Sequence, residues 1–269
     1  MDHLPYLAYV ERDASIPHII DIFSRFCGAV NCFLHLVFYT LSETYLFMIL
    51  YGMRPMTSLS RTHSGYCVHK YDCLAEKSEY FAPEIALGLM IEYVTPEDIL
   101  LDVGIGTGLS SKGFCRMGVE VVGLDSSQDM LSQCRKKGIH NIIEGDINCF
   151  FPFKDETFDH VLSVGVFHFF RSLTHIFSES HRVIKDRGIY GFTVMDPGEG
   201  PDIIERSIEG IGVYLHSQDY TEGLLDIHGF TVLKKAKFLS YTGPSKDQEI
   251  TYSLFIARKR GENNRTGIR

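Results

Sequence analysis

The strongest constraint on the fold is a glycine-rich run, Asp102-Val103-Gly104-Ile105-Gly106-Thr107-Gly108. The apolar run Ile99–Val103 leads into it as a buried parallel strand would, and a helical pattern over Leu109–Met117 follows. Glycines between a strand and a helix allow a tight turn in which the backbone approaches a ligand with no Cβ in the way. The N-terminus of the following helix offers free N–H groups to a carboxylate or phosphate. The run therefore predicts a ligand site at the end of this strand.

Strand-like and helical patterns alternate from about Ser64 onward, which predicts βαβ units and a parallel sheet with helices on both faces. The predicted strands are Ile99–Val103, Glu120–Asp125, Asn141–Glu144, Phe158–Val164 and Gly188–Met195. The predicted helices are Tyr71–Phe81, Glu84–Val94, Leu109–Met117, Gln128–Lys137, Ser172–Ile184 and a helix near Thr221–Ile227. The alternation then stops, because Phe230–Tyr241 and Ile250–Lys259 are two strand-like runs with a connection too short for a helical crossover. These two strands are predicted to be antiparallel.

Two further acids follow strands next to the glycine run. Asp125 closes the second strand, 21 residues after Gly104, where an acid accepts hydrogen bonds from ribose hydroxyls. Asp146 follows the third strand in Gly145-Asp146-Ile147. Nicotinamide dinucleotides and S-adenosylmethionine both fit this arrangement. The dinucleotide fingerprint Gly-x-Gly-x-x-Gly/Ala fits poorly, because Leu109 stands at its third position, and a simple dinucleotide fold has no place for the antiparallel pair.

Three stretches in series, LLDVGIGTGLSS, VVGLDSSQDML and IIEGDINCFFPFKDETFDHVLSVGVFHFF, resemble the successive motifs of class I S-adenosylmethionine-dependent methyltransferases, particularly the small-molecule-type branch called type 11. The resemblance covers roughly residues 71–259. It implies an α/β fold of the Rossmann-like, doubly wound type, with a seven-stranded, mostly parallel sheet and an antiparallel C-terminal strand. It also implies S-adenosylmethionine as the cofactor.

The resemblance assigns parts of the cofactor to individual residues. Asp102, Gly104, Gly106 and Gly108 would hold its methionine end and Asp125 its ribose; Ser126 and Met130 would flank the adenine, and Asp146 and Ile147 would contact the adenine edge. Ser163 would start the next cofactor-lining loop, and Tyr71 matches a Tyr-Asp element that often covers the cofactor. Many family members carry Glu where this chain has Asp102, a change that keeps the carboxylate. The first fifty residues have no counterpart in the family pattern.

The sulfonium methyl group is already electrophilic, so the protein mainly has to align a nucleophile with it and exclude water. His168, between aromatic residues just past a strand, is the candidate general base, and a packing role is the alternative. The acceptor is expected over the carboxyl ends of the strands, with its candidate contacts at Asp196, Glu199, Tyr214, His216 and Tyr220. No acceptor atom and no oligomeric state is predicted.

Composition and missing motifs exclude several classes of function. The formal net charge of −8 argues against a broad nucleic-acid footprint. Ser163-Val164-Gly165-Val166 replaces the Asn/Asp-Pro-Pro-Tyr/Phe run that amino-methylation of bases or glutamine would use. No metal site is expected, because His63, Cys67, His69 and Cys73 do not have structural-zinc spacing. Seven cysteines without a Cys-x-x-Cys pair indicate a reducing compartment, and a cytoplasmic location is expected.

The N-terminal segment differs from the rest of the chain. Residues 26–51 are largely apolar but include Asn31, His35 and Glu43, and they lack a secretory cleavage site. Three alternatives remain open: a membrane anchor, a helix docked on the domain, and an extension upstream of a start at Met53 or Met56. The expected organisation is an N-terminal extension over 1–55, a methyltransferase domain over 56–260 and a polar tail over 261–269.

The sequence thus predicts a methyltransferase that acts on a small organic acceptor. The alternatives are a membrane-associated, non-catalytic module that binds the cofactor, and a nicotinamide oxidoreductase.

Overall fold

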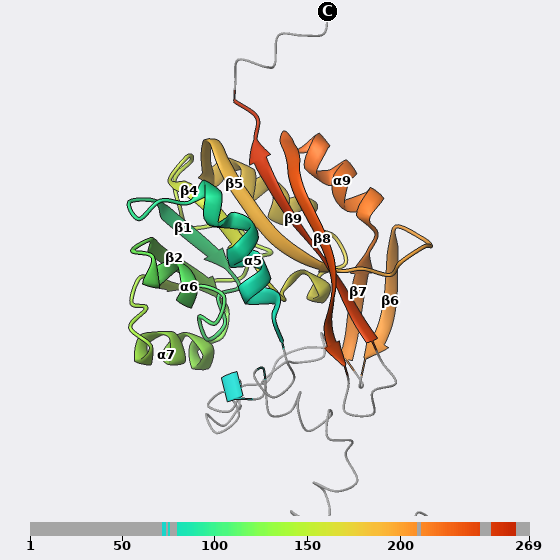
Figure 1. Cartoon of the computed structure of the whole chain (residues 1–269), viewed down its shortest axis with the longest axis horizontal. Coiled ribbons are helices and arrows are strands. Elements are labelled where there is room, and N and C mark those ends of the chain that lie inside the picture. Colours follow the sequence, from blue (N-terminus) through green and yellow to red (C-terminus); the bar gives the residue numbers. More distant parts are fainter. Residues whose placement is uncertain (1–71, 74, 76–79, 209–210, 243–248, 262–269) are drawn as a thin grey trace, which may run out of the picture. The chain divides into compact units, whose positions relative to one another are not determined.

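The computed structural model describes residues 72–73, 75, 80–208, 211–242 and 249–261 (Figure 1). Nine strands carry the fold: β1 (Ile99–Val103), β2 (Glu120–Asp125), β3 (Ile142–Glu144), β4 (Phe158–Ser163), β5 (Ile184–Met195), β6 (Ile203–Ile208), β7 (Ile211–His216), β8 (Phe230–Thr242) and β9 (Glu249–Lys259). The helices are α5 (Ala82–Met90), α6 (Lys112–Arg116), α7 (Gln128–Lys136), α8 (Thr174–Val183) and α9 (Gln218–Ile227), with short 3-10 helices η2 (Ile91–Tyr93) and η3 (Phe167–Phe169).

Seven strands form one sheet in the order β3-β2-β1-β4-β5-β9-β8. The pairs from β3 to β5 are parallel, whereas β9 is antiparallel to both β5 and β8. The predicted α/β fold, with its mostly parallel seven-stranded sheet and antiparallel C-terminal strand, is confirmed. The chain runs outward from β1 to β3 and then restarts at β4 on the other side of β1. Ligands bind at such a switch point, outside the carboxyl ends of the strands.

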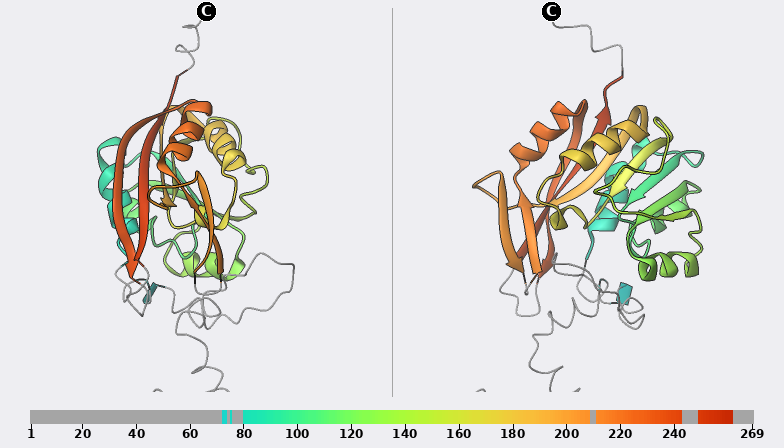
Figure 2. Two further views of the ribbon diagram at one scale, coloured as in Figure 1. Left: turned by 90° about the vertical axis from the view of Figure 1, so that its right-hand side faces the viewer. Right: turned by 180° about the vertical axis from the view of Figure 1, so that it is seen from behind.

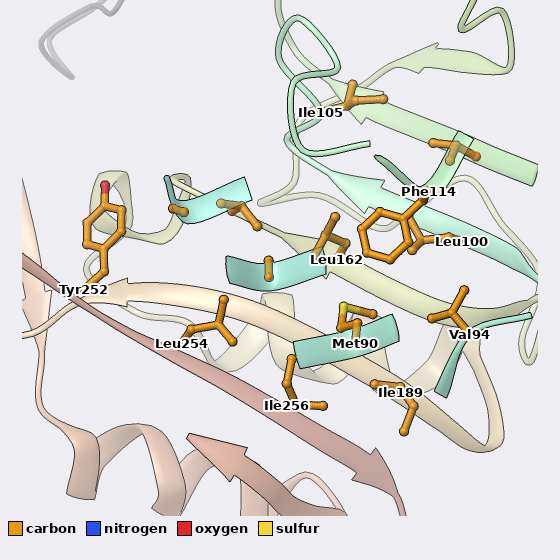
Figure 3. Packing of buried hydrophobic residues seen from close by; sticks show 14 of the residues in the cluster. Met90, Val94, Leu100, Ile105, Phe114, Leu162, Ile189, Tyr252, Leu254 and Ile256 are labelled. Atoms are coloured by element: carbon orange, nitrogen blue, oxygen red, sulfur yellow. The ribbon is translucent and has the colours of Figure 1, made fainter. Parts of the chain in front are cut away.

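Helices cover both faces of the sheet, because the central strands are apolar on both faces. On one face Leu100 and Leu162 pack with residues of α5, α6 and α7, among them Met90 and Phe114 (Figure 3). On the other face their chain neighbours Leu101 and Val161 pack with α8 and α9. The two further views in Figure 2 show these layers on either side of the sheet. Successive side chains of a strand point to opposite faces of the sheet, so the core has two parts, one on each face.

Three local predictions need correction. The helix predicted over Leu109–Met117 begins only at Lys112, because Gly108 has a φ of 79° and the chain is still turning there. The strand predicted from Gly188 begins at Ile184. The connection after β5, predicted only as a substrate segment, contains the hairpin β6–β7, which packs against η3 and β5. Its sequence signal was available: two apolar-rich runs separated by the two residues Glu209-Gly210.

Within the described part of the chain, no helix combines the length and the apolar character needed to cross a bilayer. The apolar run over residues 26–51, and with it the predicted extension over 1–55, lies outside the described residues.

Candidate functional site

The glycine turn after β1 is tied to the neighbouring strand β2. The N–H groups of Gly104 and Ile105 both donate to the Leu124 carbonyl oxygen, at 2.7 and 3.2 Å. Gly104 and Gly106 have φ angles of 76° and 54°, in the left-handed region that favours glycine. A Cβ at Gly104 would lie 2.6 Å from a Val166 methyl carbon, whereas one at Gly106 would meet nothing nearer than 4.0 Å. Gly104 therefore allows Val166 to pack closely against the turn, and Gly106 leaves open space in front of the backbone.

Asp125, at the end of β2, points its carboxylate back at this turn. Its Oδ2 accepts a hydrogen bond from the Gly106 N–H at 2.8 Å, and its Oδ1 accepts one from the Ser127 N–H at 2.8 Å. Burial raises the pKa of the Asp125 carboxyl, although these backbone N–H groups act in the opposite direction. Each carboxylate oxygen can accept more than one hydrogen bond, so both keep capacity for a ligand. A ligand with two adjacent hydroxyls fits this acceptor pair.

Asp102, near the end of β1, is a buried carboxyl that is bonded to a serine hydroxyl. Its side chain is 1% exposed, and its Oδ2 accepts a hydrogen bond from the Ser111 hydroxyl at 2.6 Å. Burial raises the pKa of Asp102 to about 7, and the negative charge of Asp125 adds to the increase. A positively charged ligand group nearby would favour the ionised form and lower this pKa.

We expect Asp102→Asn to change how the stability of the ligand-free protein depends on pH. The folded-state pKa of Asp102 lies above its unfolded value, so its contribution to the free energy of unfolding is full at low pH and is lost as the pH rises toward about 7. Relative to the wild type, the variant should gain about 2–3 kcal/mol in its free energy of unfolding between pH 5 and pH 8. Urea unfolding at both pH values measures this gain. If the free energy of unfolding had the same pH dependence in both proteins, burial would not raise the pKa of Asp102.

A pocket lies at the carboxyl ends of β1, β2, β3 and β4. Seven residues predicted from the sequence line it: Gly104, Gly106, Asp125, Ser126, Met130, Asp146 and Ile147. The structure adds Ile105, Thr107, Leu109, Ser110, Ser127 and Gly145 from the same turns, and Tyr80, Val164, Gly165, Val166, Phe169 and Phe170 from the opposite side. No lysine, arginine or histidine of the described residues lines this pocket.

Four predicted site residues lie elsewhere or outside the described residues. Asp102 is buried beneath the pocket lining. A Cβ at Gly108 would lie 2.6 Å from Ile139 Cδ1, so this glycine allows the turn to pack against the chain after α7. The fully buried Ser163 donates its hydroxyl proton to the Val103 carbonyl oxygen at 2.8 Å and ties β4 to β1. Tyr71 lies outside the described residues.

The residue after Tyr71 in the sequence contacts the glycine turn. The Thr107 hydroxyl donates to Asp72 Oδ1 at 2.5 Å, and the Lys137 ammonium pairs with the other oxygen of the same carboxylate. Lys137 also donates to the Thr107 carbonyl oxygen at 2.9 Å. Asp72 therefore connects the chain before α5 to the turn that forms the pocket.

His168 lies behind the pocket and does not line it. Its side chain is 7% exposed, its ring packs on Phe169 with 4.0 Å between ring centroids, and its Nδ1 lies 3.4 Å from the Tyr252 hydroxyl. Burial lowers the pKa of His168 to about 3, with a smaller contribution from His216, so the ring is neutral at pH 7. The general-base role stays a prediction, and the contacts described here are packing contacts.

The five candidate acceptor contacts after β5 do not line the pocket. Asp196 is buried and accepts hydrogen bonds from the Ser253 hydroxyl at 2.5 Å, Gln218 Nε2 at 2.9 Å and the Gly198 N–H at 2.7 Å. Burial raises its pKa, but these donors outweigh burial and leave the pKa below its ordinary value. His216 is fully buried and stacks on Tyr220, with ring centroids 5.7 Å apart. Asp196, His216 and Tyr220 thus anchor the hairpin and α9.

The aromatic side of the pocket was not predicted from the sequence. Phe169 and Phe170 belong to the run Phe167-His168-Phe169-Phe170, from which only the histidine was selected. Tyr80 lies in the segment 71–81, where Tyr71 was selected. The usable signal was the concentration of aromatic residues just past the carboxyl end of β4.

Comparisons with known proteins identify similar sequences and similar folds. Residues 101–192, from β1 into β5, match the family described as "Methyltransferase domain". The demethylmenaquinone methyltransferase of Tropheryma whipplei is 35% identical over 97 residues, which cover 35% of this chain and 41% of that protein. The malonyl-[acyl-carrier protein] O-methyltransferase of Salmonella typhimurium is 32% identical over 105 residues, covering 39% and 41%. The chain spans less than half the length of the curated relatives it matches.

Solved structures share the fold at low sequence identity. One is the crystal structure of Burkholderia thailandensis 1,6-didemethyltoxoflavin-N1-methyltransferase with bound 1,6-didemethyltoxoflavin and S-adenosylhomocysteine. It superposes with a TM-score of 0.57 at 16% identity, covering 76% of this chain and 92% of that chain.

Proposed function

Because residues 101–192 form a methyltransferase domain of the S-adenosylmethionine-dependent class, type 11 branch, we propose that this chain transfers a methyl group from S-adenosylmethionine to a small organic acceptor. The observation that carries the proposal is the Asp125 carboxylate, held by two backbone N–H groups beside the open space at Gly106. Relatives named for demethylmenaquinone and ubiquinone biosynthesis support a small-molecule acceptor.

The lining residues fit the parts of the cofactor. In this proposal Asp125 accepts hydrogen bonds from the two ribose hydroxyls, and Asp146 and Ile147 lie at the adenine edge, with Ser126 and Met130 on its faces. Gly106 lets the backbone approach the methionine end, because no Cβ occupies the space in front of it. The buried Asp102 offers a negative charge to the ammonium group, a pairing that would lower its raised pKa.

When bound, S-adenosylmethionine would supply an electrophilic methyl group to a lone pair of the acceptor. Its sulfur would become a neutral thioether, and any proton on the acceptor atom would pass to solvent. The protein's part is to orient the acceptor in line and to exclude water. Val166 and Phe169 exclude water at the β4 side of the pocket, because their side chains are apolar.

We expect the full chain to bind S-adenosylhomocysteine in calorimetry and to transfer labelled methyl groups into fractions of a small-molecule extract. Absence of binding by well-folded protein would contradict the proposed function. Binding with no transfer into any fraction would support a non-catalytic module instead. Binding of NAD(H) without binding of S-adenosylhomocysteine would support the oxidoreductase.

A further inference from the structure

One side of the pocket is an aromatic and aliphatic wall. Phe169, Phe170 and Val166 come from the chain between β4 and α8, and Tyr80 comes from the chain before α5. The pocket's two carboxylates lie elsewhere: Asp125 is the last residue of β2, and Asp146 follows β3. The pocket's carboxylates and its aromatic side chains therefore come from different segments of the chain.

Tyr252 on β9 supports both parts of this wall. Its ring contacts Tyr80 edge to face, with 6.4 Å between centroids, and stacks against His168 at 6.2 Å. His168 in turn packs on Phe169. Gly165 has a φ of 74°, and an added Cβ there would collide with the Tyr80 hydroxyl. Packing therefore holds Tyr80 and Phe169 in place before a ligand arrives, which lowers the entropy cost of binding.

The wall also carries no positive charge among the described residues. His168, the ionisable group directly behind it, is held neutral because burial lowers its pKa to about 3. Lys137, which contacts the pocket residue Thr107, is paired with Asp72. An anionic acceptor seated on this wall would lose hydration and would find no cationic side chain among the described lining residues to replace it. A neutral ring would instead bury apolar area and gain aromatic contacts.

We infer that the acceptor is a neutral, planar aromatic compound that packs against Phe169, Phe170 and Tyr80. The site binds such a compound more tightly than a carboxylate of the same size. This inference rests on the proposed function.

Two probes of matched shape test the inference: 2-naphthol and 2-naphthoate, titrated by calorimetry into the full chain saturated with S-adenosylhomocysteine. We expect 2-naphthol to bind at least 10-fold more tightly than 2-naphthoate. Phe169→Leu and Phe170→Leu should each weaken 2-naphthol binding about 5-fold or more. Both residues are half-buried, as is Phe153, which packs on Phe158 away from the pocket. Phe153→Leu is therefore the matched control and should leave 2-naphthol binding within 2-fold of the wild type.

The affinity for S-adenosylhomocysteine is measured in every variant, and 2-naphthol is titrated with each variant saturated by it. Only in Phe153→Leu, which lies away from the pocket, is this affinity expected to stay within 2-fold of the wild type. If S-adenosylhomocysteine fails to bind the wild-type chain, the proposed function fails. If S-adenosylhomocysteine binds, three results would each overturn the inference about the acceptor while the proposed function stands. The first is that 2-naphthoate binds as tightly as 2-naphthol or more tightly, and the second is that neither probe binds. The third is that Phe169→Leu and Phe170→Leu have the same affinity for 2-naphthol as Phe153→Leu.

Discussion

Asp125→Asn should weaken the binding of S-adenosylhomocysteine by about 100-fold or more. The proposed ribose contacts are two hydrogen bonds to a carboxylate, each worth ~1.5–3 kcal/mol, and a 100-fold loss corresponds to about 2.7 kcal/mol. An asparagine cannot accept on both sides at once, so its NH2 group would also face either the Gly106 N–H or the Ser127 N–H. Calorimetric titration of the variant and the wild type measures the loss.

Asp129→Asn is the matched control for this substitution, because Asp129 lies four residues further on, in the first turn of α7, and does not line the pocket. Its affinity for S-adenosylhomocysteine should stay within about 3-fold of the wild type, an effect below 1 kcal/mol. Equal affinities in Asp125→Asn and Asp129→Asn would remove Asp125 from the ligand contacts.

Gly104→Ala should lower the free energy of unfolding by about 2–4 kcal/mol. A non-glycine residue in the left-handed region costs ~1–3 kcal/mol by itself. The added Cβ would also lie 2.6 and 2.8 Å from the two methyl carbons of Val166, so rotating that side chain exchanges one clash for the other. Urea unfolding measures the loss, and titration of S-adenosylhomocysteine should show weaker binding because the turn that carries Gly106 is displaced.

Two further variants separate backbone strain from the clash. Gly138 has a φ of 85°, and a Cβ added there would meet only open space, so Gly138→Ala carries strain alone and should cost about 1 kcal/mol. Adding Val166→Ala to Gly104→Ala should recover part of the lost stability. If Gly104→Ala and Gly138→Ala lose equal stability, the contact with Val166 does not contribute.

The fold could be predicted because its determinants are local in the sequence. Runs such as Ile99–Val103 and Phe158–Val164 are rich in apolar residues, which identifies buried parallel strands, and the positive φ at Gly104 is a demand that glycine meets. The hairpin β6–β7 was not predicted, because it interrupts the alternation of strands and helices that the preceding sequence indicates. The predicted start of α6 was too early, because the helical sequence pattern begins at Leu109, directly after Gly108. Gly108 has a positive φ and belongs to the turn before the helix.

The cofactor side of the pocket was also predictable, because Asp125 and Asp146 follow successive strands whose ends meet at one edge of the sheet. The aromatic side was not. Tyr80 and Tyr252 are far apart in the sequence and come together only through the packing of β9 next to β5. The environment of His168 depends on the same packing, so its burial and neutral ring could not be inferred from the run that contains it.

The position of β9 in the sheet has a consequence for biosynthesis. β8 pairs only with β9 among the described strands, and β9 is made after β8, yet it lies between β8 and β5. While the ribosome is still adding residues 249–259, β5 presents an open edge, and β8 has no neighbour to hold it on the nascent sheet. Tyr252 arrives with β9, so the aromatic wall gains its support only in this last step. A product truncated before residue 249 would therefore lack both the outer part of the sheet and the backing of the acceptor side.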